Sequence, residues 1–319
     1  MTNISVSVTT NATVTGPIGS RLYHVVDGKI QTEACEISIA EHCNLRCRGC
    51  SHLSPVLPAD LADPDVIYRD LAVLARHYHA EHLRILGGEP LLHPRILEVV
   101  AAVRASGVTD RIRILTNGML MERMSERFWQ AVDEIHVSVY PGFEPSQEAL
   151  TAWRDRAQEH TTEVIVKRFG WFRESYSEAG TQNPELVSRI YSTCQIAHVW
   201  RCHNVSNGRF YKCPQSVFLS RLRRGRTTDV AHSNGVALVD HPSLGQSLLD
   251  YLQDPRPLPA CGNCLGSVGR RFEHEQVSRK DWRRHQAAGT EDLLDHQYLR
   301  LLERDAGAAN GCVADSHRL

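Results

Sequence analysis

Short apolar runs rich in β-branched residues alternate with longer amphipathic segments between residues 36 and 169. This alternation is typical of βα units that build a parallel sheet. It predicts an α/β fold, and Asp63 followed by Pro64 is typical of a helix start. The predicted strands cover residues 36–40, 83–86, 111–116, 134–140 and 163–169, and the predicted helices cover residues 64–79, 94–106, 122–132 and 146–160.

Several predicted strands are followed directly by residues that could form part of an active site. Cys43, Glu89, Asn117 and Pro141 each come just after a predicted strand. In barrels of βα units the loops after the strands build the active site. We therefore expect these residues to lie together at the rim formed by the carboxyl ends of the strands.

Composition and charge narrow the class of protein. The chain has 319 residues, 42% of them hydrophobic and 23% charged, which suits one large domain or a large and a small one. A net charge of -1 and a pI near 7.0 give no sign of a nucleic-acid or membrane partner. Residues 1–15 do not resemble a secretory signal, and no apolar run is long enough to span a membrane.

Cysteine usage points to cofactor binding. The ten cysteines are clustered at spacings typical of metal ligands, which favours ligands in a reducing compartment over a disulfide framework. We expect a cytoplasmic protein. Cys43, Cys47 and Cys50 stand four and then three residues apart, so they can occupy three corners of an iron–sulfur cube. The fourth iron would remain free to bind a small molecule.

A second motif, Gly87, Gly88, Glu89 and Pro90, ends the next predicted strand. Together the two motifs resemble the radical S-adenosylmethionine (SAM) superfamily. The resemblance implies a partial (β/α) barrel, a [4Fe-4S] cluster on the three cysteines, and SAM bound to its open iron. It also implies that the glycine-rich turn receives the SAM amino group. A zinc knuckle is the alternative, but it leaves this turn unexplained.

One position departs from the family pattern. Members usually carry an aromatic residue before the third cysteine, where it helps to seat the adenine, and this chain has Gly49. We expect His52 or Tyr140 to supply that contact. Asn117 and Ser138 are further candidates for SAM contacts, with a simple turn and inward barrel packing as the respective alternatives. Lys167 or Arg168 could pair with a carboxylate.

Cysteines return after residue 190, in a region that resembles the twitch domain of the same superfamily. The resemblance implies a second [4Fe-4S] cluster on Cys194, Cys213, Cys261 and Cys264, with Gly208 five residues before Cys213. Four thiolates on zinc remain the alternative. The expected organisation is an N-terminal extension over residues 1–34, the partial barrel over 35–180, an auxiliary cluster domain over 181–290, and a C-terminal helix with a flexible tail over 291–319.

Cys202 is left over from this assignment. It could donate a hydrogen atom to a substrate radical, pack as a small hydrophobe or act as an alternative ligand. Residues 36–266 resemble sugar- and aminocyclitol-tailoring members such as 2-deoxy-scyllo-inosamine dehydrogenase and, less closely, neomycin C epimerase. Because five cysteines leave one beyond the four that a cluster needs, we favour a carbohydrate epimerase.

Three alternatives remain. The same substrate radical could be oxidised to a ketone with the second cluster as electron acceptor, which would make the protein a dehydrogenase. A peptide-modifying maturase would bring a leader-recognition domain, for which the first thirty-five residues are short. A non-enzymatic electron carrier does not need an open coordination site. The enzyme readings imply a flavodoxin- or ferredoxin-type reductant and a small-molecule substrate.

Overall fold

Parallel strands form the centre of the molecule. The computed structural model describes residues 5–7, 23–222 and 234–315, with side chains described for residues 23–222 and 234–305. Its main sheet has ten strands in the order β1-β7-β6-β5-β4-β3-β9-β10-β11, with β2 paired to β3. The strands are β1 Ser5–Ser7, β2 His24–Val26, β3 Lys29–Ala40, β4 Tyr78–Gly87, β5 Thr109–Thr116, β6 Glu134–Val139, β7 Glu163–Arg168, β9 His203–Ser206, β10 Arg209–Tyr211 and β11 Gly235–Ala237.

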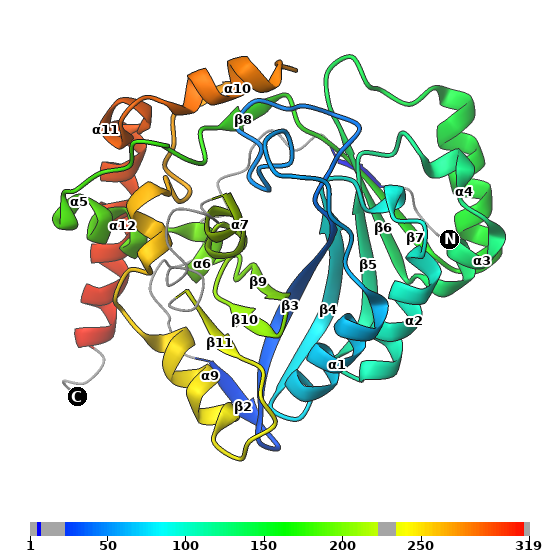
Figure 1. Cartoon of the computed structure of the whole chain (residues 1–319), viewed down its shortest axis with the longest axis horizontal. Coiled ribbons are helices and arrows are strands. Elements are labelled where there is room, and N and C mark those ends of the chain that lie inside the picture. The colour runs from blue at the N-terminus through cyan, green and yellow to red at the C-terminus, as the bar shows by residue number, and fades with distance from the viewer. Residues whose placement is uncertain (1–4, 8–22, 223–233, 316–319) are drawn as a thin grey trace.

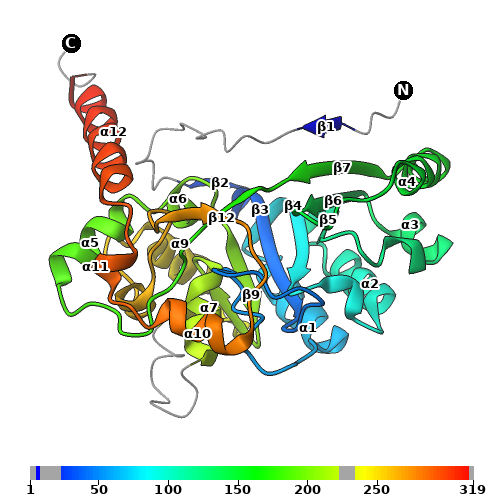
Figure 2. The same cartoon turned by 90° about the horizontal axis from the view of Figure 1, so that it is seen from above.

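Helices follow the strands of the first half in the way that βα units require. In the spatial order of the sheet, every neighbouring pair from β1 to β9 is parallel. The pairs β9–β10, β10–β11 and β2–β3 are antiparallel. These helices pack along one side of the sheet (Figures 1 and 2). They are α1 Pro64–Leu74, α2 Ile96–Ser106, α3 Glu126–Ala131 and α4 Gln147–His160, with short 3-10 turns at Pro90–Leu92 and Met121–Arg123. The α/β prediction with a partial barrel is confirmed.

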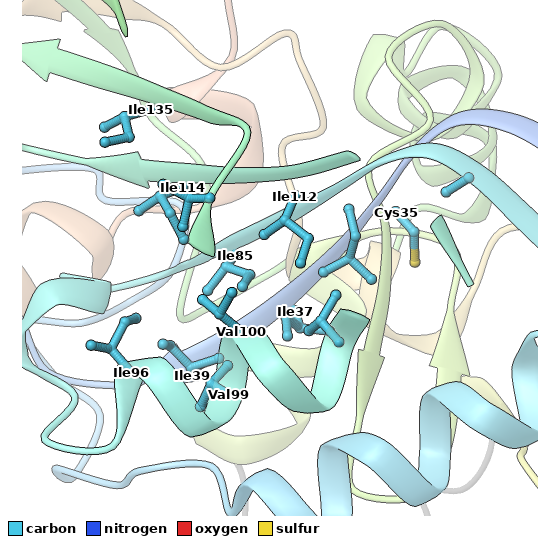
Figure 3. Close-up of a cluster of buried hydrophobic side chains, with 14 of the residues drawn as sticks. Cys35, Ile37, Ile39, Ile85, Ile96, Val99, Val100, Ile112, Ile114 and Ile135 are labelled. Carbon is cyan, nitrogen blue, oxygen red and sulfur yellow. The ribbon is translucent and has the colours of Figure 1, made fainter. Parts of the chain in front are cut away.

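The hydrophobic core lies between the strands and these helices. Every second residue of a strand points to this side, so Ile37, Ile85 and Ile112 meet Val99 and Val100 of α2 (Figure 3). All five side chains are buried. Burial of this apolar surface stabilises the fold by about 25 cal/mol for each Å² removed from water.

The opposite side of the same strands is polar. Arg84, Arg113, His136, Ser138 and Lys167 alternate with the core residues and are partly exposed. We call this side, which also carries Glu36, the inner face of the sheet. A sheet with one apolar and one polar side leaves the polar side available for binding.

The order of the predicted elements is confirmed, but two helices were predicted too long. The segment over residues 122–132 is an α-helix only over Glu126–Ala131, after the 3-10 turn at Met121–Arg123. The segment over residues 64–79 ends as a helix at Leu74, because Tyr78 begins β4 and pairs with Ile30. The helix start was correct: Asp63 caps it by accepting a hydrogen bond from the Asp65 amide at 3.1 Å. Strand β3 begins at Lys29, seven residues before the predicted start.

The second half of the chain joins the same sheet. Its β9 pairs with β3 through Cys35, Glu36 and Ile37, so the sheet continues from the barrel into this module. A separate two-stranded ribbon pairs β8 Trp171–Arg173 with β12 Arg271–Glu273. The helices are α5 Pro184–Ser192, α6 Gln195–His198, α7 Pro214–Leu222, α9 Leu244–Gln253, α10 Arg279–Gln286, α11 Thr290–Leu293 and α12 His296–Asp315, with a 3-10 turn at Pro259–Asn263.

The C-terminal segment corrects one expectation. Residues 307–315, predicted as flexible tail because they are small and polar, continue helix α12 as far as Asp315. Figure 2 shows α12 projecting from the body of the molecule. Residues 1–4, 8–22, 223–233 and 316–319 lie outside the described part of the chain, so the N-terminal extension is described only in part. Among the residues described, no helix combines the length and apolar character needed to cross a membrane.

Candidate active site

The loop after β3 brings Cys43, Cys47 and Cys50 together. Burial is the largest cause that raises the pKa of Cys43 and of Cys47 to about 12, and the negative charge of Cys50 adds to it. Such mutual repulsion shows that the three sulfur atoms face a common space. A cationic metal centre would reverse this preference and hold the three groups as thiolates.

The turn of Gly87 and Gly88 lies directly against this loop. The Gly88 amide donates to the Ala40 carbonyl at 2.6 Å, and the Glu89 amide donates to the His42 carbonyl at 3.0 Å. A Cβ atom on Gly87 would lie 2.4 Å from the Ala40 oxygen, and one on Gly88 would lie 2.2 Å from the His42 oxygen. A side chain at either position would therefore prevent the close contact between the glycine turn and the cysteine loop, which explains why both residues are glycine.

Glu89 organises the turn from within. Its side chain is 0% exposed and accepts hydrogen bonds from Thr116 Oγ1 at 2.6 Å, from the Asn117 amide at 2.8 Å and from the Leu91 amide at 3.1 Å. Burial raises its pKa, whereas these hydrogen bonds oppose the rise. The carboxylate thus ties the ends of β4 and β5 together, and Pro90 begins the 3-10 turn that follows. The expected contact of Glu89 with the SAM amino group remains a prediction.

Asn117 and Ser138 lie at neighbouring strand ends. The Asn117 side-chain amide donates to Asn44 Oδ1 at 2.7 Å and lies 3.8 Å from Cys43 Sγ. Ser138 is on the inner face, and its side chain hydrogen-bonds to Tyr140. Both residues therefore border the space in front of the first cysteine group, and their contacts with SAM remain predictions.

His274 and Gln276 approach the same cysteines from the far end of the chain. His274 Nε2 lies 3.2 Å from Cys47 Sγ, and the Gln276 amide nitrogen donates to that sulfur at 3.3 Å. The ring of His274 stacks on Tyr140 with centroids 4.8 Å apart. Sequence reasoning gave His274 no role, because nothing in its local pattern indicates a partner so distant in sequence.

The side chain missing at Gly49 is replaced from another element. Gly49 has a φ of 64°, and a Cβ atom there would lie 2.7 Å from Cζ of Phe272 on β12. The Arg48 guanidinium carbon lies 4.2 Å above the centre of the same ring. An aromatic ring therefore does occupy the space beside the third cysteine, but it comes from Phe272, which the sequence pattern did not indicate.

Of the two residues expected to replace the missing aromatic, only Tyr140 has its ring at the first cysteine group, whereas His52 contacts Cys50 through its backbone. The negative charges of Cys47 and Cys50 contribute, after burial, to the raised pKa of Tyr140. His52 instead packs edge-on against Phe218, with ring centroids 5.1 Å apart. Burial lowers the pKa of His52 to about 4, so the ring is a neutral part of the packing around α7.

Four cysteines of the second module line one cavity: Cys194, Cys213, Cys261 and Cys264. Tyr191 and Lys212 contribute to its wall. Burial raises the pKa of Cys264 well above its usual range, and the charges of the other three thiols add to the rise. Gly208 is not at the cavity: it has a φ of 74° and lies in the turn between β9 and β10.

The spacing of both cysteine groups bears on which metal they suit. Four thiolates around one zinc ion lie about 3.8 Å from one another, since Zn–S distances are about 2.3 Å. In the described part of the chain, the only group of three or more His, Cys, Asp or Glu ligand atoms within 4.8 Å of one another is Glu126, Glu159 and His160. Neither cysteine group is as compact in this structure as a single tetrahedral ion requires.

Cys202 lies apart from the four-thiol cavity. It precedes Asn204 on β9 by two residues, and Asn204 pairs with Glu36, so both side chains point to the inner face. The residue Cys202 is partly exposed, but its thiol is buried and hydrogen-bonds to the Glu36 carboxylate, which also pairs with Arg84 at 3.2 Å. Burial, and then the charge of Glu36, raise the pKa of Cys202 well above its usual range. The residue therefore keeps its S–H bond at neutral pH.

Comparisons with known proteins agree with this architecture. The model of the radical SAM superfamily matches residues 37–183. GTP 3',8-cyclase from Microcystis aeruginosa is 30% identical over 105 residues, which are 32% of this chain and 32% of that protein. Molybdenum cofactor biosynthesis protein 1 from Drosophila melanogaster is 32% identical over 141 residues, 43% of this chain and 22% of that protein.

Solved structures show a weaker similarity over more of the chain. BtrN in complex with AdoMet and 2-DOIA is 15% identical, with a TM-score of 0.42, over 73% of this chain and 92% of that one. SuiB of Streptococcus suis bound to S-adenosylmethionine is 13% identical, with a TM-score of 0.36, over 71% of this chain and 67% of that one. The chain spans about a third of the length of the first GTP 3',8-cyclase that it matches. The match to the radical SAM superfamily model spans residues 37–183, just under half of the chain.

Proposed function

We propose that the protein is a radical SAM enzyme that inverts a carbon centre of a sugar or aminocyclitol substrate, with Cys202 as the hydrogen-atom donor. Cys43, Cys47 and Cys50 would hold the [4Fe-4S] cluster that binds SAM. Cys194, Cys213, Cys261 and Cys264 would hold a second [4Fe-4S] cluster. The observation that carries the proposal is the position of Cys202, which is outside the four-thiol cavity and on the inner face beside Glu36.

When bound, the reduced first cluster and SAM supply a 5′-deoxyadenosyl radical that removes a hydrogen atom from a substrate carbon. Cys202 then gives its hydrogen atom to the opposite face of that carbon, so that a C–H bond forms and the S–H bond breaks. Glu36 accepts the thiol hydrogen bond and keeps Cys202 oriented toward the inner face. Restoring the thiol takes one proton, which Glu36 is placed to pass on, and one electron from a flavodoxin- or ferredoxin-type reductant.

Dehydrogenation is the second candidate, because four thiols surround one cavity. The second cluster would then accept the electron that the substrate radical loses together with a proton, and the product would be a ketone. The relatives named GTP 3',8-cyclase raise GTP as a third substrate to be tested. Their similarity covers about a third of the chain, so the proposal rests on the residues of the site.

Iron content is the first test. Anaerobically reconstituted wild type and Cys202→Ala are both expected to hold about eight irons, and SAM should change the EPR signal of one reduced cluster. Loss of iron in Cys202→Ala would make Cys202 a ligand and overturn the donor role. If the wild type holds only about four irons, the proposed second cluster is absent.

The reaction is then followed in D2O with dithionite, SAM and three candidate substrates: neomycin C, 2-deoxy-scyllo-inosamine and GTP. Epimerisation through Cys202 places one solvent deuterium on the inverted carbon, because the thiol hydrogen exchanges with solvent. Cys202→Ala should still cleave SAM and form no deuterated epimer. A ketone formed equally by both proteins would establish dehydrogenation instead.

A further inference from the structure

One lateral row of the inner face is made entirely of polar side chains. The strand registers place Asn204 beside Glu36, Glu36 beside Arg84, Arg84 beside Arg113, and Arg113 beside Glu134. Two ion pairs lie within the row, Arg84 with Glu36 at 3.2 Å and Arg113 with Glu134 at 2.5 Å. Such pairs fix the positions of the guanidinium groups while part of each remains exposed.

On β7 the row continues with Glu163, which lies beside Glu134, and Lys167 adds a further cation to the inner face four residues along the same strand. This lysine is partly exposed on β7, beside Ser138, and it has no hydrogen bond or ion pair to any residue in the described part of the chain. Burial lowers its pKa first, and the charges of Arg113 and Arg84 lower it further. Arg111 lies on the same face as Arg113 and pairs with Glu134 and Glu163, so four cations meet three carboxylates and the face carries one excess positive charge.

His136 does not change this balance. It lies on the same face, and burial together with the charges of Arg113 and Lys167 lowers its pKa to about 3. The ring is therefore neutral at physiological pH. Repulsion among the cations would be relieved by an anion that binds between them.

Asn204 supplies an independent sign of a missing ligand. Its side chain is 0% exposed, and neither its amide nitrogen nor its amide oxygen has a hydrogen-bond partner. A buried amide without partners is unfavourable, so such groups are normally satisfied in the working state of a protein. Asn204 is two residues from Cys202 on the same face of the strand.

We propose that the inner face binds an anionic polyol, whose carboxylate or phosphate group pairs with Lys167 and whose hydroxyl groups hydrogen-bond to Asn204. This inference rests on the proposed function and specifies its substrate class. The anion lies at the end of the face that carries Lys167, Arg113 and Arg84. The hydroxyl-bearing carbons then extend toward Asn204, within reach of Cys202.

Binding can be measured without turnover. Isothermal titration of the reconstituted enzyme with SAM present would compare glucuronate, glucose 6-phosphate and uncharged glucose. We expect one anionic probe to bind at least about tenfold more tightly than glucose, and the preferred probe identifies a carboxylate or a phosphate as the anion. Lys167→Met should weaken that probe about tenfold, and glucose by much less.

Control variants separate the anion site from folding. Lys280→Met makes the same substitution at an exposed position of α10 and should leave binding unchanged. Asn204→Leu should weaken the preferred probe while the free energy of unfolding stays the same or rises, because an unsatisfied buried amide is removed.

Two results would overturn the inference. One is that neither anionic probe binds more tightly than glucose. The other is that Lys167→Met weakens SAM in place of the probe, which would assign the lysine to the SAM carboxylate. Iron content reports separately on the proposed function, and the control Lys280→Met should change neither iron content nor SAM cleavage.

Discussion

The Nε2 atom of His274 lies 3.2 Å from the Sγ atom of Cys47, although 227 positions separate the two residues in the sequence. The loop after β12 thus reaches across to the first cysteine group. The Gln276 amide contacts the same sulfur, and the Arg48 amide donates to the Glu275 carbonyl at 3.0 Å. The second half of the chain therefore contributes directly to the surroundings of the first cofactor site.

His274→Ala should lower the reduction potential of the first cluster by tens of millivolts. Hydrogen bonds to a ligand sulfur stabilise the reduced, more negative state, and the variant removes one of them. An EPR-monitored redox titration would measure the change. His241→Ala, at an exposed position before α9, is the matched control. An unchanged potential in His274→Ala would show that Gln276 alone sets this interaction.

Gly88→Ala should prevent assembly of the first site. Its Cβ atom would lie 2.2 Å from the His42 carbonyl oxygen, so the turn must move away from the loop that carries Cys43. We expect iron binding to fall by about half, since the second group of thiols lies elsewhere. Gly170→Ala, where the added Cβ meets no atom within 4 Å, should bind iron like the wild type.

Lys212→Met should lower the reduction potential of the second centre. The lysine is 1% exposed in the wall of the four-thiol cavity, and its Nζ donates to Tyr191 Oη at 2.8 Å and to the Asp254 carbonyl at 3.1 Å. A nearby cation favours the reduced state, and its loss should shift the potential downward by tens of millivolts. A second centre without any redox signal, in wild type and variant alike, would identify zinc.

Stability should fall as the pH drops below about 6.5, because His203 is held neutral. Burial lowers its pKa to about 3, and its ring contacts Tyr23 Oη and the Lys212 carbonyl at 3.0 Å each. The unfolded chain binds a proton near pH 6.5 that the native state excludes, so this residue opposes folding by roughly 2 kcal/mol at about pH 5.

His203→Gln should therefore lose less stability between about pH 7.5 and 5 than the wild type does. Urea unfolding at both pH values would measure the difference. Equal losses in the two proteins would mean that His203 is protonated in the native state. Other buried histidines, His52 among them, contribute equally to both proteins and cancel in the comparison.

Elements that depend on neighbouring residues in the sequence could be predicted from the sequence alone. Alternating apolar residues marked β4 through β7, and Asp63 with Pro64 marked the start of α1, because both depend on neighbouring residues. The end of α1 was missed because Tyr78 belongs to β4 through its pairing with Ile30, a contact between distant segments. Both residues are buried, and this burial stabilises Tyr78 in the strand over its continuation of the helix.

The site shows the same division. The spacing of Cys43, Cys47 and Cys50 was visible in the sequence, and the four thiols of the second module could be grouped by their resemblance to a known pattern. Phe272 beside Gly49 and His274 beside Cys47 could not be found in this way, because ribbon β8–β12 brings them there from the end of the chain. Only the folded chain places these residues.

The pairing of β9 with β3 makes the strands beside the two cysteine-lined sites part of one sheet. Proteins that open and close between lobes need a few residues that absorb the backbone rotation, and a shared sheet resists such bending. Electron tunnelling weakens steeply as the gap between two redox centres widens. Centres held at these two sites would keep a constant separation through the catalytic cycle, so the rate of exchange between them would depend on driving force and not on domain closure.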